Sequence, residues 1–92
     1  MIARRLVICG RVQGVGYREG MIDAAQAFGV AGWVRNRADG TVEAWVQGDA
    51  ERVERAIAWC RRGPSMARVS GIDVVEESVS PAIVSFTHRR TE

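Results

Sequence analysis

The chain has 92 residues, enough for one domain only, because a second hydrophobic core would be too small to hold in so short a chain. Hydrophobic residues make up 47% of it, which excludes intrinsic disorder, and the net charge of +2 indicates small anions rather than nucleic acid as partners. All thirteen basic residues are arginines, which excludes a Schiff-base lysine, a lysine general base and a Walker-type phosphate loop.

The first predicted elements are a strand, a glycine-rich loop and a helix. Residues Leu6 to Cys9 are continuously apolar, which favours a buried strand over a helix of one turn. Three glycines follow within the seven residues from Gly10 to Gly16. Apolar residues then recur at helical spacing from Tyr17 to Phe28, and Gly29 is the predicted C-cap.

A hairpin and a second helix are predicted next. Two extended runs, Val30 to Arg35 and Thr41 to Gln47, are joined through the turn signal Asp39-Gly40. Asp49 is the predicted N-cap of the second helix, which ends at Gly63-Pro64.

The last predicted strands are Val69 to Val75 and Ile83 to His88, separated by a turn at Ser78 to Pro81. The whole order is β-α-β-β-α-β plus a C-terminal strand, without an internal repeat or a linker. It is typical of the split βαβ arrangement, an α+β fold with an antiparallel sheet and both helices on one face.

The glycine loop is a candidate anion site. Because it lies between a strand and the start of a helix, free backbone N–H groups and the positive end of the helix dipole converge there. Arg18, directly after Gly14-Val15-Gly16-Tyr17, could bind two oxygens of a bound phosphate with its forked guanidinium. The alternative is that the glycines only permit a tight turn and that Arg18 is a solvated charge.

Asn36 is the second candidate. Asparagine is common at the start of a hairpin turn simply because its side chain satisfies local backbone groups. Its amide cannot act as a base, but it can hold a water molecule by donating and accepting hydrogen bonds. Arg18 would then bind the anion while Asn36 holds the water.

Two stretches of sequence carry a resemblance to a known family. Gly10-Arg11-Val12-Gln13-Gly14-Val15-Gly16-Tyr17-Arg18 resembles the first signature of the acylphosphatase family. Gly32-Trp33-Val34-Arg35-Asn36, followed by Gly40-Thr41-Val42 and Gly48, resembles the second. The segment from Gly63 to Val69 is similar to the family's segment after the second helix.

This resemblance implies a ferredoxin-like two-layer sandwich over residues 1–92 and hydrolysis of acyl phosphates to a carboxylate and inorganic phosphate, with no cofactor and no metal. It implies that Asn36 positions the attacking water. It also implies that the phosphoryl group binds to the loop made of Gly14, Val15, Gly16, Tyr17 and Arg18. The chain departs from the family at Tyr17, where phenylalanine is commoner, and in the ending at residues 87–92, which leaves the packing of the last strand open.

The chemistry limits the substrate independently. Without a metal, a lysine or an evident acid, the site can position the substrate and stabilise charge but gives a leaving group little help. A carboxylate with a pKa of about 4 departs unprotonated, whereas the alkoxide of a phosphate monoester does not. Acyl phosphates therefore fit, and His88, the rival base, is interpreted as a solvated residue near the terminus.

Another class of function stays open. The alternation of residues along the strands sends Trp33 and Trp45 to the open face of the sheet, where they could stack single-stranded nucleic acid or bind a peptide. Against it, residues 40–47 lack the basic-aromatic pattern of RNA-recognition sheets. A third interpretation is a relative of the acylphosphatase-like modules of larger maturation proteins. The partner we expect is a small-molecule acyl phosphate, with no nucleic acid, no membrane and a monomeric state.

The cysteines and the N-terminal sequence complete the expectations. Cys9 and Cys60, with the single His88, cannot supply the four ligands of a structural zinc. Because Cys9 is predicted on the open sheet face and Cys60 on a helix at the other side, both thiols should stay free. The first apolar run is shorter than a signal-peptide core, so we expect a soluble, cytoplasmic protein.

Overall fold

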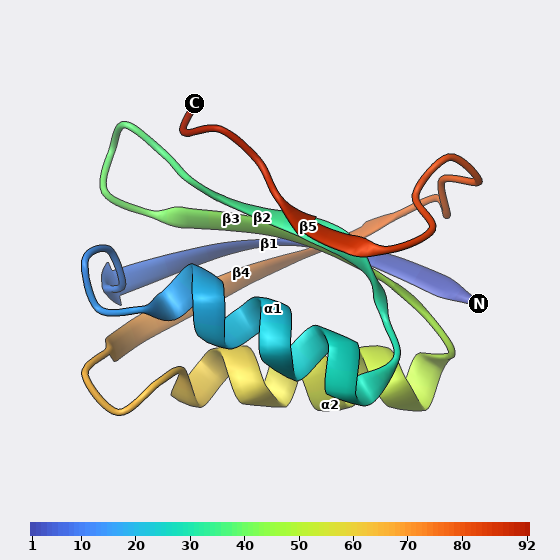
Figure 1. The fold of residues 1–92 in the computed structure, drawn as a ribbon, viewed down its shortest axis with the longest axis horizontal. Helices are drawn as coiled ribbons and strands as arrows, with labels where there is room; N and C mark the ends of the chain where they lie inside the picture. Colours follow the sequence, from blue (N-terminus) through green and yellow to red (C-terminus); the bar gives the residue numbers. More distant parts are fainter.

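The strands and helices form two layers: a five-stranded sheet is covered on one face by two helices (Figure 1). This computed structural model describes residues 1–92. In chain order the elements are β1 (Ile2–Arg11), α1 (Tyr17–Phe28), β2 (Ala31–Asn36), β3 (Val42–Gly48), α2 (Ala50–Arg62), β4 (Arg68–Glu77) and β5 (Phe86–His88). The predicted fold class and order of elements are confirmed.

The sheet has the strand order β4-β1-β3-β2-β5. The first four of these strands pair antiparallel, with Leu6 opposite Ala44 in the central pair. β5 pairs in parallel with β2, so the sheet is mixed and the prediction of a wholly antiparallel sheet is wrong at this edge. The cause is topological: β4 and β2 run in opposite directions, so a chain that reverses after β4 necessarily runs along β2.

The last strand is also shorter than predicted. Residues 83–85 of the expected strand are not part of β5: Ile83 closes a turn by donating its N–H to the carbonyl of Ser80 at 3.2 Å, and the two residues after it lead into the strand. Gln47 holds this turn, because its Nε2 donates to the carbonyls of Ser80 and Ile83, at 2.8 Å and 3.0 Å. β5 therefore begins only at Phe86, the one residue of this strand that is buried.

The core lies between the helices and the sheet. Alternate strand residues face the helices as the period of two predicts, namely Leu6, Ile8, Val34, Val42, Ala44 and Val46. Both predicted helix ends are confirmed: Gly29 caps α1 in the left-handed conformation, with φ 73°, and the side chain of Asp49 accepts from the N–H of Glu51 at 2.9 Å. No helix has the length and apolar character needed to cross a membrane.

The opposite face of the sheet carries ion pairs and the two tryptophans, Trp33 and Trp45. Glu43 is only 7% exposed and accepts from Arg35 at 2.7 Å. The guanidinium of Arg89 lies over the ring of Trp33, 4.5 Å from its centroid. Trp33 is therefore covered by charge rather than presented as a bare aromatic surface.

Candidate active site

The loop between β1 and α1 has a backbone that two of its glycines make possible. Gly14 and Gly16 have φ values of 74° and 79°, in the left-handed region where a side chain strains the backbone. A Cβ built on either would meet no atom within 4 Å, so the conformation rather than crowding requires glycine. Val12, 1% exposed, anchors the loop in the core. The loop is thus fixed from inside and open to solvent on its outer side.

The N–H groups of this loop have no acceptor in the protein. Gly16 is the N-cap of α1 and has no side chain to cap it, and the first helical bond runs from Gly20 N–H to Gly16 O at 3.0 Å. No hydrogen bond of the structure uses the N–H groups of Val15, Gly16, Tyr17, Arg18 and Glu19. Five consecutive free donors at the positive end of a helix are an arrangement that can bind an anion.

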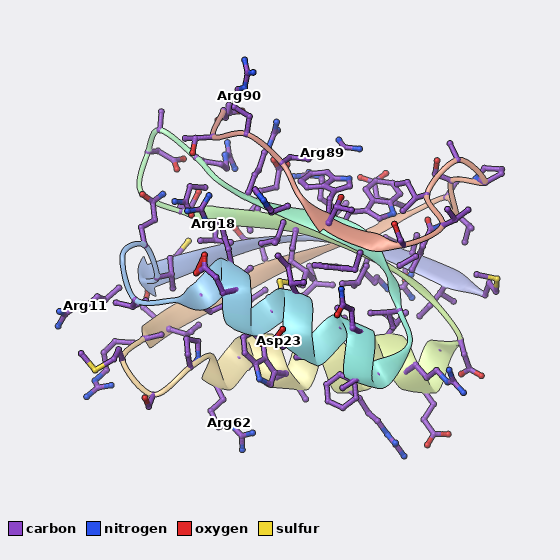
Figure 2. The ribbon with its side chains drawn as sticks, viewed as in Figure 1. Arg11, Arg18, Asp23, Arg62, Arg89 and Arg90 are labelled. Atoms are coloured by element: carbon purple, nitrogen blue, oxygen red, sulfur yellow. The ribbon has the colours of Figure 1, made fainter.

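Arg18 adds a free cation to these donors. It lies in the first turn of α1 (Figure 2), is half-buried, and makes neither an ion pair nor a side-chain hydrogen bond. Two other arginines near this end are engaged: Arg35 contacts Glu43 at 2.6 Å, and Arg37 contacts Glu92 at 3.3 Å. The guanidinium of Arg18 is therefore available to an external anion.

Asn36 is the last residue of β2 and pairs with Val42 of β3. Its backbone carbonyl accepts from the N–H of Glu92 at 3.2 Å, which fastens the end of the chain to the end of this strand. Its half-buried side-chain amide has no hydrogen bond within the protein. Both its donor and its acceptor are thus free for a water molecule.

The turn after Asn36 is braced by Asp39. A carboxylate oxygen of Asp39 accepts from the hydroxyl of Thr41 at 2.6 Å and from its N–H at 3.0 Å. These bonds hold the pKa of the Asp39 carboxyl below its usual value, the Thr41 hydroxyl contributing most. The turn therefore keeps one shape over the pH range in which Asp39 is ionised.

Gln13 brings the loop and the turn together. Its Nε2 donates to the carbonyl of Arg37 at 2.8 Å and to that of Thr41 at 2.9 Å. Both segments lie at the same end of the molecule (Figure 1), so Arg18 and Asn36, predicted from separate motifs, belong to joined segments. Sequence reasoning missed Gln13, because its partners are backbone atoms 24 and 28 positions away that no residue type announces.

Tyr17 fastens the start of α1 to the end of α2. Its hydroxyl donates to the carbonyl of Cys60 at 2.6 Å, and its ring contacts Trp59 edge-on at 5.5 Å. The residue four positions after Cys60 is Pro64, which has no N–H, so no helical donor exists for this carbonyl. Burial raises the pKa of the Tyr17 hydroxyl, which keeps it a neutral donor.

The remaining candidates lie outside this arrangement. His88 is exposed on β5 and makes no side-chain hydrogen bond. Cys9 and Cys60 are both free, as predicted. Trp59 packs between the two helices, and a Cβ at Gly20 would lie 3.1 Å from its indole, closer than an ordinary van der Waals contact.

Comparisons with known proteins agree with this geometry. The family model described as Acylphosphatase matches residues 4–88. The acylphosphatase of Acidiphilium cryptum (strain JF-5) is 52% identical over 92 residues, 99% of each chain. The crystal structure of acylphosphatase from Bacillus subtilis superposes with a TM-score of 0.92 at 31% identity and covers 97% of this chain and 99% of that one. An acylphosphatase structure from Coxiella burnetii gives a TM-score of 0.90 at 30% identity, over 96% and 92%.

Proposed function

The chain belongs to the acylphosphatase family, and from this membership we propose how its residues divide the reaction. Its activity is the hydrolysis of the carboxyl–phosphate bond of an acyl phosphate, which yields a carboxylate and inorganic phosphate. We propose that the phosphoryl group binds in the loop of Gly14, Val15, Gly16, Tyr17 and Arg18. The observation that carries this proposal is the run of acceptor-free N–H groups beside an unpaired, half-buried guanidinium.

Binding there stabilises the charge that moves during the reaction. Backbone N–H groups contact the equatorial oxygens without side-chain rearrangement, and the Arg18 fork takes two oxygens at once. Because the donors are already held in place by the helix and by the buried Val12, little reorganisation accompanies the transfer.

We propose that Asn36 orients the attacking water. Its amide oxygen accepts one hydrogen of the water while its NH₂ group donates, which fixes the lone pair that attacks phosphorus. An amide takes no proton, so the proton of the water passes to a phosphate oxygen of the substrate. The bond from phosphorus to the acyl oxygen breaks, and the carboxylate leaves with the electron pair.

We propose that this hydrolysis uses no metal and no general acid. The support is the leaving group: a carboxylate with a pKa of about 4 needs no proton to depart at neutral pH. His88 then has no part in the reaction. We also propose that the protein is a cytoplasmic monomer whose partner is the small acyl phosphate itself.

We propose that the open sheet face does not bind nucleic acid. Stacking needs a bare aromatic face, and Trp33 is only 7% exposed, with the Arg89 guanidinium over its ring. The basic group of Arg5 on that face is paired with Glu43 and Glu77, at 3.4 Å and 3.3 Å, which reduces the positive charge that this face offers to phosphates.

The test compares two substrates of the purified protein, a synthetic aromatic acyl phosphate and an aryl phosphate monoester, each with and without a chelator. We expect rapid hydrolysis of the acyl phosphate, unchanged by the chelator, and almost none of the monoester. His88→Ala should keep the parent rate. Loss of activity with the chelator, or a strong fall in His88→Ala, would contradict the proposed mechanism.

A further inference from the structure

One side chain joins the two halves of the site. Gln13 lies between Val12 and Gly14 in the loop, and it alone makes side-chain hydrogen bonds from this loop to the β2–β3 turn. Both acceptors of the Gln13 side chain are backbone carbonyl oxygens. Each of the two hydrogens of its amide NH₂ group is donated to one of these carbonyls, so the NH₂ group must face the turn. The amide therefore has a single orientation, set by the turn.

The two carbonyls are the ones that close the turn. The N–H of Arg37 donates to the carbonyl of Thr41 at 2.9 Å, and the N–H of Gly40 donates to the carbonyl of Arg37 at 3.1 Å. Each of these carbonyls thus accepts one bond from the turn and one from Gln13. Arg37 follows Asn36 directly, so a movement of the turn moves the Asn36 backbone with it.

Asn36 is otherwise held by the backbone of the sheet and by the C-terminal segment. Its strand neighbours are β3 and the segment after β5, through Val42 and the N–H of Glu92. The phosphate loop, in contrast, is held by the core and by α1. The sheet ladder links the strands, since Val42 pairs with both Asn36 and Ile8, but beyond β1 only the Gln13 amide makes side-chain hydrogen bonds from the loop to the β2–β3 turn.

We propose that Gln13 is a positioning residue for hydrolysis, which fixes the Asn36 amide relative to the phosphoryl group by tying the β2–β3 turn to the phosphate loop. This inference rests on the proposed role of Asn36. Gln13 acts on the attack of water rather than on the binding of phosphate, because the loop N–H groups and Arg18 do not depend on the turn for their geometry. A displacement of about 1 Å at a reacting group can cost 10²-fold in rate.

The protein contains a matched control for this role. Gln47 also donates through Nε2 to two backbone carbonyls of a turn, those of Ser80 and Ile83. That turn lies at the opposite end of the molecule from the glycine loop (Figure 1). Gln13→Met and Gln47→Met therefore each remove a glutamine that bridges a turn, and only the first touches the site.

The experiment measures kcat, KM, the inhibition constant of inorganic phosphate and the urea midpoint of each purified variant. We expect Gln13→Met to lose about tenfold or more in kcat while phosphate inhibition stays within about twofold, and Gln47→Met to lose stability but keep kcat. The double variant Gln13→Met/Asn36→Ala should be no slower than Asn36→Ala, because Gln13 acts through that residue. Gln13→Asn, whose side chain is one methylene shorter, should also lose kcat while phosphate inhibition stays unchanged. It replaces Gln13→Met in the experiment if the methionine variant does not fold.

A kcat of Gln13→Met within twofold of the parent would overturn the inference. So would a parallel loss of phosphate affinity, multiplied effects in the double variant, or failure of both Gln13 variants to fold, since each indicates a role other than positioning Asn36. The outcome also separates the two proposals. If Asn36→Ala keeps the parent kcat, the proposed role of Asn36 fails; if it is slow and Gln13→Met is not, only the role of Gln13 fails.

Discussion

Replacing Tyr17 by phenylalanine removes one buried hydrogen bond and no other interaction of comparable energy. The phenyl ring keeps the contact with Trp59, so no cavity forms. The carbonyl of Cys60 loses its donor, and Pro64 cannot supply another. Cys60 is 0% exposed, so water does not take the place of the hydroxyl. An unsatisfied buried carbonyl costs about 1–3 kcal/mol.

For a chain of 92 residues, each kcal/mol corresponds to about 4–8 °C in Tm. Tyr17→Phe should therefore unfold at least about 4 °C below the parent and at a lower urea midpoint with an unchanged m-value. Circular dichroism during thermal and urea unfolding measures both quantities. A Tm within 2 °C of the parent, at unchanged m-value, would show that the Cys60 carbonyl is satisfied without the hydroxyl and that this reasoning is wrong.

Three further predictions concern the site and the thiols. Arg18→Lys should lose about 10²–10³ in kcat/KM despite keeping its charge, because an ammonium cannot bind two oxygens as the forked guanidinium does. The control Arg55→Lys, on the exposed side of α2, should match the parent. Equal kcat/KM values of the two variants would show that Arg18 is not part of the site. Asn36→Ala should lose most of its kcat while phosphate still inhibits competitively at the parent concentration, and a variant that loses phosphate affinity but keeps turnover would make Asn36 a binding residue. Burial raises the pKa of the Cys60 thiol to about 12, so iodoacetamide at pH 8 should alkylate only the half-buried Cys9 in the native protein and both thiols in urea. Intact mass spectrometry counts the adducts, and two adducts on the native protein would contradict this prediction.

Local patterns account for most of what could be read before the structure. The helix from Tyr17 to Phe28 was predictable because apolar spacing and Gly29 act within one segment, and the N-cap Asp49 is equally local. The same holds for the anion loop, since consecutive free N–H groups arise wherever a glycine loop enters a helix. The roles proposed for Arg18 and Asn36 needed the resemblance, because neither residue type is distinctive by itself.

The edge of the sheet shows where local patterns stop. Residues 83–88 have the composition of a strand, and only Phe86–His88 form one, because Gln47 of β3, two strands away in the sheet, holds the preceding turn. The parallel direction of β5 follows from the opposite directions of β4 and β2, which no property of its own residues reveals.

The amino-acid sequence by itself determined which segments become helices and strands and where the glycine loop enters α1, because these depend on neighbours along the chain. Only the tertiary structure decided how the loop meets the turn and how the two helices are fastened. Gln13 and Tyr17 form these links by donating to backbone carbonyls, at 2.8 Å to Arg37 and 2.6 Å to Cys60. Every residue type carries a carbonyl, so the partner of such a bond is chosen by the folded backbone and leaves no mark in the sequence.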